Sequence, residues 1–423
     1  MIGTLSDDAA AALRREIDAK TSGPSPQIPG LLYLSLDKAG NALFRHVSGV
    51  RGIGFDAPMT YDTIFYMASF TKLITSIACM QMVEQGKLHL DDAAQVLSVA
   101  PELGVVQVLE RHSGGNIRKV PKEAEITLRM LLTHTVSAGF GYAFEDPKLR
   151  DWALPTGLDD FSGIKADVLD RPLVNQPGSK FQYGTSMDWV GVLIERTSGL
   201  SLEEYFRQHI FESAGIKDIS FYPTRDMKGR LAYMHQRQPD GTLSVRSHLY
   251  RAPLVASDTP LEERYCMAGA GCYGSPIEFC ELLATLLNDG TSPKTKKQLL
   301  RPETVTEMFR DQIPDKARDC NEQWPSANPQ LANGTPLVLA PEGTTEGWGL
   351  SFSLSHQKSL TGRAAGAGSW EGLPNLFWFV DRDNGIAGMI ASQILPYGDL
   401  PVIQLAEHIE SQVYQAALGA CST

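Results

Sequence analysis

The fold is decided by the stretch Tyr66-Met67-Ala68-Ser69-Phe70-Thr71-Lys72-Leu73, in which a lysine follows a serine by three positions. After it, apolar residues recur at helical spacing, and Gly86 supplies a stop signal. The pattern predicts an amphipathic helix that begins at Ser69. Residues three positions apart share one face of a helix, so we expect the Lys72 ammonium to reach the Ser69 hydroxyl.

This serine–lysine pair is typical of nucleophilic catalysis. A serine hydroxyl attacks poorly until a neighbouring base takes its proton, and Lys72 is placed to activate it. The unpaired N–H groups at a helix N-terminus also favour a developing oxyanion. An isolated match of this kind is common by chance, however, and a serine that caps a helix beside a solvated lysine explains it at least as well.

A second segment, Pro177-Gly178-Ser179-Lys180-Phe181-Gln182-Tyr183-Gly184-Thr185-Ser186, delivers a tyrosine just ahead of another helical pattern. If the fold holds the Tyr183 phenol between Ser69 and Lys72, it can pass a proton to the leaving group as general acid and base. The alternative is an aromatic residue that only packs at the start of the helix.

A third segment reads Ala367-Gly368-Ser369-Trp370-Glu371-Gly372-Leu373-Pro374-Asn375 and precedes a predicted strand. A glycine-rich edge strand lets a substrate approach the backbone closely. One of its N–H groups, together with that of Ser69, would form an oxyanion hole, and each such donor lowers a barrier by about 3 kcal/mol. A β-bulge with a packed Trp370 is the alternative.

Strand patterns stand near both ends of the 423-residue chain. Residues 31–36 and 42–47 flank one turn, residues 376–380 and 386–391 flank another, and helical spacing follows from Val402. They predict an antiparallel sheet built from both termini, with the last helix on one face. The middle is richer in helix signals, and its long irregular stretches, 113–125 and 314–343, are expected to line a site or lid. For the second of these, plain surface loops are an equal alternative.

The composition narrows the classes of partner. A formal net charge of −11 disfavours nucleic acid and anionic membranes. The start shows no secretory pattern and no apolar run is long enough to span a bilayer, so we expect a cytoplasmic protein without a membrane partner. The six cysteines form no CxxC pair, and no His and Cys cluster has zinc-ligand spacing. We expect free thiols, no metal and no cofactor.

The three segments, in this order and at these separations, resemble the serine β-lactamase-like superfamily, in which Ser-x-x-Lys is a known signature. They are most similar to family VIII carboxylesterases and to the fungal acyltransferases that tailor polyketides, such as the acyltransferase of lovastatin biosynthesis. Two further segments, 131–135 and 269–271, support the resemblance, which runs from about Ile28 to the terminal helix.

The resemblance implies an α/β (α+β) fold of the β-lactamase/transpeptidase type, with an antiparallel sheet flanked by helices and a mostly helical middle region. The whole chain, 1–423, would be a single catalytic domain. Its α/β part would comprise about 1–85 and 330–423, and its largely helical part about 86–329. The site would lie between the two parts.

The resemblance also implies roles for particular residues. Ser69 would carry a covalent acyl group, with Lys72 orienting and activating it and Tyr183 serving as base and acid. Leu373 matches the strand residue whose N–H completes the oxyanion hole with Ser69. The residues expected to border the acyl pocket are Trp370, Glu371 and Gly372. His134, in the segment 131–135, is interpreted as a structural, hydrogen-bonded residue rather than a catalytic one.

The sequence departs from the β-lactamase pattern at two places. Thr185 stands where those enzymes usually carry asparagine, and Trp370-Glu371-Gly372 stands where they carry Lys-Thr-Gly. The missing lysine removes the cation that holds a β-lactam carboxylate, and Glu371 would repel that group. We therefore expect the pocket to prefer uncharged esters or thioesters, and Trp-x-Gly is the pattern of the family VIII esterases.

The predicted function is a serine-dependent ester hydrolase or transesterase that forms an acyl-Ser69 intermediate on small-molecule esters or thioesters, in fungal secondary metabolism. An acyl-carrier protein is one form that the donor could take. The alternatives are a β-lactamase or D-amino-acid peptidase, and a non-catalytic protein that kept the fold. The sequence leaves the acyl donor, the acceptor and the oligomeric state open.

Overall fold

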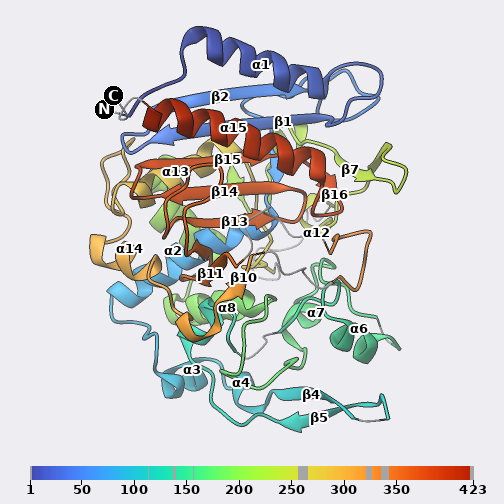
Figure 1. Cartoon of the computed structure of the whole chain (residues 1–423). Helices are drawn as coiled ribbons and strands as arrows, with labels where there is room; N and C mark the ends of the chain where they lie inside the picture. The colour runs from blue at the N-terminus through green and yellow to red at the C-terminus, as the bar shows by residue number, and fades with distance from the viewer. Residues whose placement is uncertain are drawn as a thin grey trace.

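A large antiparallel sheet organises the computed structural model, which describes residues 2–112, 114–136, 140–155, 157–255, 265–320, 326–334 and 343–419. Figure 1 shows the sheet, in which β1 from the first part of the sequence lies beside β15 from the last part. In spatial order its eight strands are β10 (Arg318–Asp319), β11 (Thr345–Trp348), β12 (Ser353–Ser355), β13 (Gly368–Gly372), β14 (Leu376–Asp381), β15 (Ile386–Ala391), β1 (Gly30–Asp37) and β2 (Ala42–Gly49).

The centre of the sheet joins the two ends of the sequence. Strand β1 pairs antiparallel with β15, with Leu32 opposite Ala391 and Asp37 opposite Ile386. On its other side β1 forms the N-terminal hairpin with β2, and β15 forms the C-terminal hairpin with β14. The predicted antiparallel sheet from both termini is therefore confirmed.

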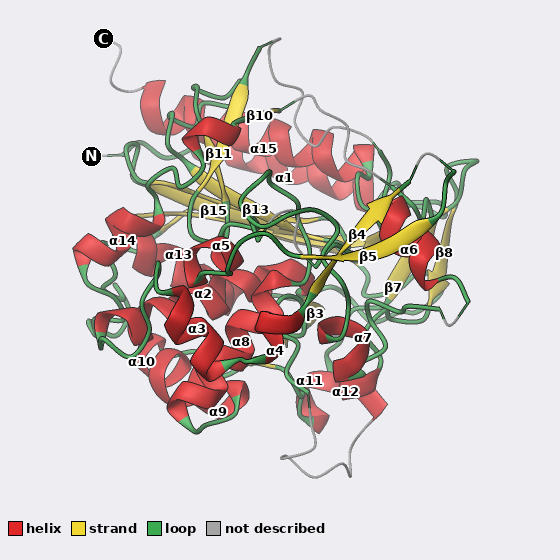
Figure 2. Ribbon diagram, turned by 90° about the horizontal axis from the view of Figure 1, so that it is seen from below, coloured by secondary structure: helices red, strands yellow, loops and turns green. Residues whose placement is uncertain are grey.

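Both faces of the sheet are covered by helices (Figures 1 and 2). Along β1, Leu31 and Tyr33 pack in one core with α1 (Asp7–Thr21) and α15 (Leu400–Gly419). The alternate positions, Leu32 and Leu34, belong to a larger core on the other face, which also contains α13 (Pro276–Leu287). This alternation is the period-2 pattern of a strand that is buried on both sides.

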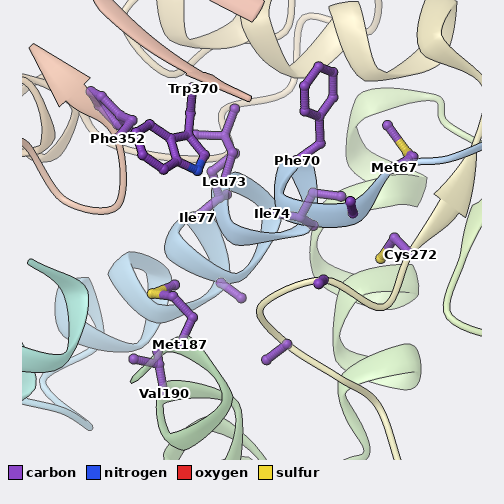
Figure 3. Close-up of a cluster of buried hydrophobic side chains, with 14 of the residues drawn as sticks. Met67, Phe70, Leu73, Ile74, Ile77, Met187, Val190, Cys272, Phe352 and Trp370 are labelled. Carbon is purple, nitrogen blue, oxygen red and sulfur yellow. The ribbon is translucent and has the colours of Figure 1, made fainter. Parts of the chain in front are cut away.

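Helix α2 (Thr71–Glu84) lies inside the larger core. Every residue from Thr71 to Met82 is buried, so the helix is enclosed on all sides and is not the amphipathic helix that the sequence suggested. Its hydroxyl groups are satisfied internally, since Thr75 donates to the Ala268 carbonyl at 2.7 Å. Figure 3 shows Phe70 and Trp370 on one side of the helix, and Met187 and Val190 of α8 (Ser186–Ser198) on the opposite side.

The rest of the middle region consists of short helices and small sheets. Its remaining helices are α3 (Ala93–Val99), α4 (Glu102–Val105), α5 (Leu128–Leu132), α6 (Pro147–Ala153), α7 (Lys165–Leu169), α9 (Leu202–Phe206), a π-helical turn (Arg207–Phe211), α10 (Glu212–Ala214), α11 (Arg225–Gly229), α12 (Ala252–Val255), α14 (Pro302–Met308) and a 3₁₀ turn (Pro314–Lys316). One small sheet has the strand order β16 (Ile394–Leu395), β7 (Met234–Arg237) and β8 (Leu243–Arg246). A second has the order β3 (Phe65–Tyr66), β9 (Tyr273–Gly274) and β6 (Ile219–Ser220). A further sheet pairs β4 (Gln107–Arg111) with β5 (Ile117–Pro121).

The stretch 113–125, expected to be irregular, contains strand β5, which pairs antiparallel with β4 from Gln107 opposite Pro121 to Arg111 opposite Ile117. That expectation was wrong because the adjacent charged residues within β5 interrupt the alternation of apolar and polar residues by which a strand is predicted. The stretch 314–343 includes β10, while residues 321–325 and 335–342 lie outside the described part of the chain. Within the described ranges no helix has the length and apolar character needed to cross a membrane.

Candidate active site

Ser69 lies at a sharp bend between a strand and a helix. Strand β3 leads into a 3₁₀ turn, Ala68–Phe70, that runs directly into α2. Ala68 has φ 45°, a left-handed conformation that costs a non-glycine residue about 1–3 kcal/mol and is concentrated at functional sites. The bend is held by the Thr71 hydroxyl, which donates to the Ala68 carbonyl at 2.7 Å. Ser69 is 9% exposed at this point.

The structure brings Lys72 and Tyr183 to the Ser69 hydroxyl from different parts of the chain. The Lys72 ammonium Nζ donates to Ser69 Oγ at 3.1 Å. The Tyr183 hydroxyl donates to the same oxygen at 2.6 Å. Gly184 lets the segment after Tyr183 pack closely against Phe140, because a Cβ there would lie 2.2 Å from the Phe140 carbonyl oxygen.

Lys72 is fully buried and has three hydrogen-bond partners. Besides Ser69, it donates to the Tyr142 hydroxyl at 3.1 Å and to the Gly269 carbonyl at 2.8 Å. Burial lowers the pKa of Lys72 to about 7, against the opposing effect of the Asp188 carboxyl. A buried lysine of this kind has a neutral amine available near neutral pH, which can accept a proton.

Tyr183 is held as a neutral phenol. Burial raises its pKa well above the usual value, even though the Ser69 hydroxyl and the Trp370 indole both lower it. The Trp370 Nε1–H donates to the Tyr183 hydroxyl oxygen at 3.0 Å, so the phenol accepts from one side and donates to Ser69 on the other. Such a phenol is better suited to giving up a proton to a leaving group than to taking one from Ser69.

A cavity of about 550 Å³, part of it open to solvent, lies over these groups. Its walls are mainly apolar and aromatic, as is usual for a small-molecule site. Ser69 and Tyr183 line it together with Ala68, Tyr142, Phe144, Glu145, Phe161, Ala270, Ala332, Trp370, Glu371, Leu373 and Tyr397. Gly372 is not among the lining residues, and a Cβ on it would lie 2.9 Å from the Met67 carbonyl oxygen.

Two backbone N–H groups remain available in the lining of this cavity. Within the described residues, neither the Ser69 N–H nor the Leu373 N–H donates a backbone hydrogen bond. Both residues line the cavity, one from the 3₁₀ turn and the other from the end of β13. Paired N–H donors of this kind stabilise an oxyanion.

Strand β13 is an edge strand only in its second half. Gly368 and Ser369 pair with β12, at Leu354 and Ser353. From Trp370 onward the described residues provide no partner strand on that side, and this half lies next to the 3₁₀ turn that carries Ser69. The prediction of a glycine-rich edge therefore holds for the half that reaches the cavity.

Thr185 and His134 are buried residues that do not line the cavity. Thr185 is buried and its hydroxyl lies 3.1 Å from the Phe140 carbonyl oxygen and 3.2 Å from that of Val168. His134 is buried too, but neither ring nitrogen has a hydrogen-bond partner in the described part of the chain, so the expectation of a hydrogen-bonded histidine was wrong. Its ring packs against Tyr183 instead, with centroids 4.8 Å apart.

Glu371 lies in the cavity wall as a weakened acid. Burial raises its pKa to about 8, against the lowering effect of the hydrogen bond from the Tyr397 hydroxyl. At neutral pH the protonated form therefore predominates. The repulsion of carboxylates that the sequence suggested for Glu371 is correspondingly weaker in the empty pocket.

Three polar residues at the site were not anticipated from the sequence. Tyr142 accepts a hydrogen bond from Lys72, and Glu145 lines the cavity. Asp188 accepts from the Gly269 N–H at 3.2 Å, next to the carbonyl that holds Lys72. Asp188 could have been found from the sequence, because it lies in the first turn of the predicted helix that follows Tyr183. Tyr142 and Glu145 stand in a loop without a periodic pattern, so the sequence offered no comparable signal for them. No group of three or more His, Cys, Asp or Glu in the described ranges could hold a metal ion.

Comparison with known proteins identifies the family. Residues 17–407 match the Beta-lactamase family. The chain is 31% identical to monacolin J acid methylbutanoyltransferase of Aspergillus terreus, over 98% of this chain and 98% of the relative. It is also 31% identical to lovastatin esterase of Penicillium rubens, over 92% of this chain and 95% of the relative.

The fold agrees with these sequence matches. The structure of simvastatin synthase from Aspergillus terreus superposes with a TM-score of 0.79 at 30% identity, covering 96% of each chain. The predicted β-lactamase/transpeptidase-like fold and the predicted class of enzyme, a serine hydrolase or acyltransferase, are confirmed. This chain belongs to the Beta-lactamase family and is similar to its esterases and acyltransferases.

Proposed function

We propose that the protein transfers acyl groups through an ester formed on Ser69, with Lys72 and Tyr183 moving the protons. The observation that carries the proposal is the position of Ser69 Oγ, which is hydrogen-bonded to the Lys72 amine at 3.1 Å and to the Tyr183 phenol at 2.6 Å. Its place in the lining of an apolar cavity supplies the second requirement, a site for the acyl group.

In the first half of the reaction, neutral Lys72 accepts the Ser69 proton while Oγ bonds to the substrate carbonyl carbon. The carbonyl oxygen becomes an oxyanion between the Ser69 and Leu373 N–H groups. Its collapse breaks the bond to the leaving group, which takes a proton from Tyr183. Lys72 then returns its extra proton to the Tyr183 phenolate, and acyl-Ser69 remains. The lowered pKa of Lys72 and the raised pKa of Tyr183 support this division of roles.

In the second half, water or an alcohol attacks acyl-Ser69 and gives its proton to Lys72. Ser69 Oγ leaves and takes a proton from Tyr183, which recovers one from Lys72. Hydrolysis and transfer differ only in this acceptor. The names of the relatives, an acyltransferase and an esterase, support both outcomes, and we propose a hydroxyl of a small secondary metabolite as the natural acceptor. A small-molecule thioester is the simplest donor, and an acyl-carrier-protein thioester is a second form of the same chemistry.

The test is the intact mass of the protein after brief exposure to 4-nitrophenyl butyrate. We expect the mass to rise by one butyryl group on Ser69 and to fall again as an added alcohol deacylates it. Ser69→Ala should abolish both the labelling and the turnover. Ser76→Ala is the matched control, because it removes a buried hydroxyl of the same helix that lies outside the cavity lining and donates to the Leu350 carbonyl. Full activity in Ser69→Ala would refute the proposal.

A β-lactamase activity is the competing proposal within the family. Thr185 is turned toward two backbone carbonyls, and no lysine lines the cavity at β13, so a β-lactam carboxylate has no cation to meet there. We expect hydrolysis of nitrocefin to be at least a hundredfold slower than that of 4-nitrophenyl butyrate, about 3 kcal/mol in barrier. Comparable rates would reverse this ranking.

A further inference from the structure

Two carboxyl groups line the acyl cavity without a role in the proposed chemistry. They belong to Glu145, in the loop before α6, and to Glu371, on β13. Glu145 is only 8% exposed, and its Oε2 atom has no hydrogen-bond partner among the described residues. A buried polar atom left unpaired is costly, so its presence in a cavity wall indicates a partner that a ligand supplies.

The carboxyls at the cavity have no direct ion pair in the part of the chain that the structure describes. Within the described ranges, Glu145, Glu371 and Asp188 form no ion pair within 4.0 Å, although the field of Lys72 acts on both Glu145 and Asp188. The charges of Arg318 and Arg363 act on Glu371, and that of Arg318 also acts on Glu145, but within the described residues neither carboxyl has a cation in direct contact. Other buried or half-buried carboxyls of the region are paired with arginines, namely Asp160 with Arg171, Glu346 with Arg318, and Glu410 with Arg363.

The pKa values of the two wall carboxyls are consistent with a binding site for a cation. Burial raises the pKa of Glu371 to about 8 and that of Glu145 well above its usual value. The raised pKa of each carboxyl favours its neutral form, although the Tyr397 hydroxyl donates a hydrogen bond to Glu371. An arriving cation reverses this balance and lets them ionise.

Aromatic rings complete the same wall. Tyr142 stacks on Phe144 with centroids 5.1 Å apart, and Phe144 stacks on Phe161 at 5.8 Å. All three line the cavity with Trp370 and Tyr397. Aromatic faces attract cations, and aromatic walls together with carboxyls are the chemistry by which proteins recognise quaternary ammonium groups.

We propose that the cavity selects substrates that carry an ammonium group, in the acyl part or in the acceptor alcohol, and binds it between Glu145, Glu371 and the aromatic wall. The inference rests on acyl transfer at Ser69 and adds the substrate class to it. It also accounts for the Glu145 carboxyl, whose Oε2 atom an uncharged acyl chain would leave without a partner among the described residues.

The acyl part is tested with two 4-nitrophenyl esters of the same shape that differ in one charge. One carries the 4-(trimethylammonio)butanoyl group and the other the 5,5-dimethylhexanoyl group. Each kcat/KM is divided by the rate constant of hydroxide-catalysed hydrolysis, which removes intrinsic reactivity. We expect at least a tenfold preference for the cationic ester, and the anionic hydrogen glutarate ester should be the poorest of the three.

The acceptor part is tested in the same way by comparing choline with its uncharged analogue 3,3-dimethylbutan-1-ol in deacylation of butyryl-Ser69. We expect the preference for the ammonium partner in at least one of the two comparisons. Glu145→Gln and Glu371→Gln should each lower that preference at least threefold. Glu195→Gln is the matched control, since Glu195 is a largely buried carboxyl outside the cavity that accepts from the Leu202 N–H, and it should leave the preference unchanged.

The outcomes separate this inference from the proposed function. If turnover depends on Ser69 but neither comparison shows a preference for the cation, the ammonium inference is wrong and the acyl chemistry stands. If Ser69→Ala retains turnover, the acyl chemistry itself fails. If no ester is turned over, the affinities of choline and 3,3-dimethylbutan-1-ol for the Ser69→Ala variant are measured by calorimetry instead. We expect choline to bind at least tenfold more tightly. Equal affinities would overturn the inference.

Discussion

The indole N–H of Trp370 lies 3.0 Å from the hydroxyl oxygen of Tyr183, and the two ring centroids are 4.9 Å apart. Trp370 belongs to β13, in the sheet, whereas Tyr183 lies in the loop before α8, in the helical region. A residue of the sheet therefore holds the Tyr183 phenol, which belongs to the helical region, in position. Strand β13 thus supplies the Trp370 donor to the proposed proton-transfer group as well as a wall of the cavity.

Trp370→Phe should lower kcat more than it raises KM, because it removes the N–H that holds the phenol. A hydrogen bond of this kind is worth about 1 kcal/mol, so we expect a loss of about fivefold to tenfold in the turnover of 4-nitrophenyl butyrate. Trp378→Phe is the control: Trp378 stands opposite Trp370 on β14, and its indole N–H has no partner in the described part of the chain. An equal loss in both variants would assign the effect to packing.

The acidic limb of the pH profile should report Lys72. The proposed mechanism needs the neutral amine, and burial lowers the pKa of Lys72 to about 7. Activity should accordingly fall as the pH drops below that value and reach a plateau above it. The measurement is kcat/KM for 4-nitrophenyl butyrate between about pH 3.5 and about pH 9.

Lys72→Arg places a permanent charge at the same position and should lose activity by about 10²–10⁴-fold over this whole range. Lys148→Arg, which lies outside the cavity lining, serves as the control and should keep the wild-type profile. An acidic limb near pH 4 in the wild type would contradict the assignment, because it would belong to a carboxyl with an ordinary pKa.

Thr185→Val should reduce stability rather than chemistry. The hydroxyl lies within hydrogen-bond distance of two buried carbonyls, those of Phe140 and Val168, and its loss should cost about 1–3 kcal/mol in the free energy of unfolding. Denaturant titration measures this, and Thr185→Ser should recover most of it. If Thr185→Val loses turnover at unchanged stability, the hydroxyl takes part in the reaction after all.

Arg171→Met should be the most destabilising of these changes. Arg171 donates to Asp160 at 2.7 Å and to the Gly141 carbonyl at 2.8 Å, and both members of the ion pair are buried. Removing one partner strands the other charge, which costs about 3–5 kcal/mol. Arg196→Met, in the exposed pair with Glu102, should cost about 1 kcal/mol or less in the same denaturant titration. Similar losses in the two variants would contradict this reasoning.

The sequence was sufficient for the elements whose signals are local. Both hairpins were predicted because strand alternation and turn residues lie within about ten positions of each other. Ser69 and Lys72 were placed together because their spacing corresponds to one helical turn. The interpretation of α2 as amphipathic failed because the polar residues of the helix are buried as well. The Thr75 hydroxyl, for example, is satisfied by a tertiary contact with the Ala268 carbonyl.

The surroundings of Lys72 could not be predicted in this way. Tyr142 and Gly269 meet the amine from positions 70 and 197 residues away, and no spacing rule connects them to it. Glu145 stands in an irregular loop, so neither its burial nor its position in the cavity wall could be predicted from the residue pattern. The placement of Tyr183 beside Ser69 came from a resemblance between whole segments and not from spacing.

The enclosure of α2 has a consequence for how this protein can change. A helix with no solvent-facing side between Thr71 and Met82 is expected to exchange its amide hydrogens only when the whole molecule unfolds. The 3₁₀ turn that carries Ser69, the proposed nucleophile, runs directly into this helix. Much of the cavity wall comes instead from loops such as the one that contains Phe144 and Glu145. Loops tolerate substitution far better than buried helices do. New substrate ranges can therefore evolve by replacing those walls while the reacting oxygen stays in place.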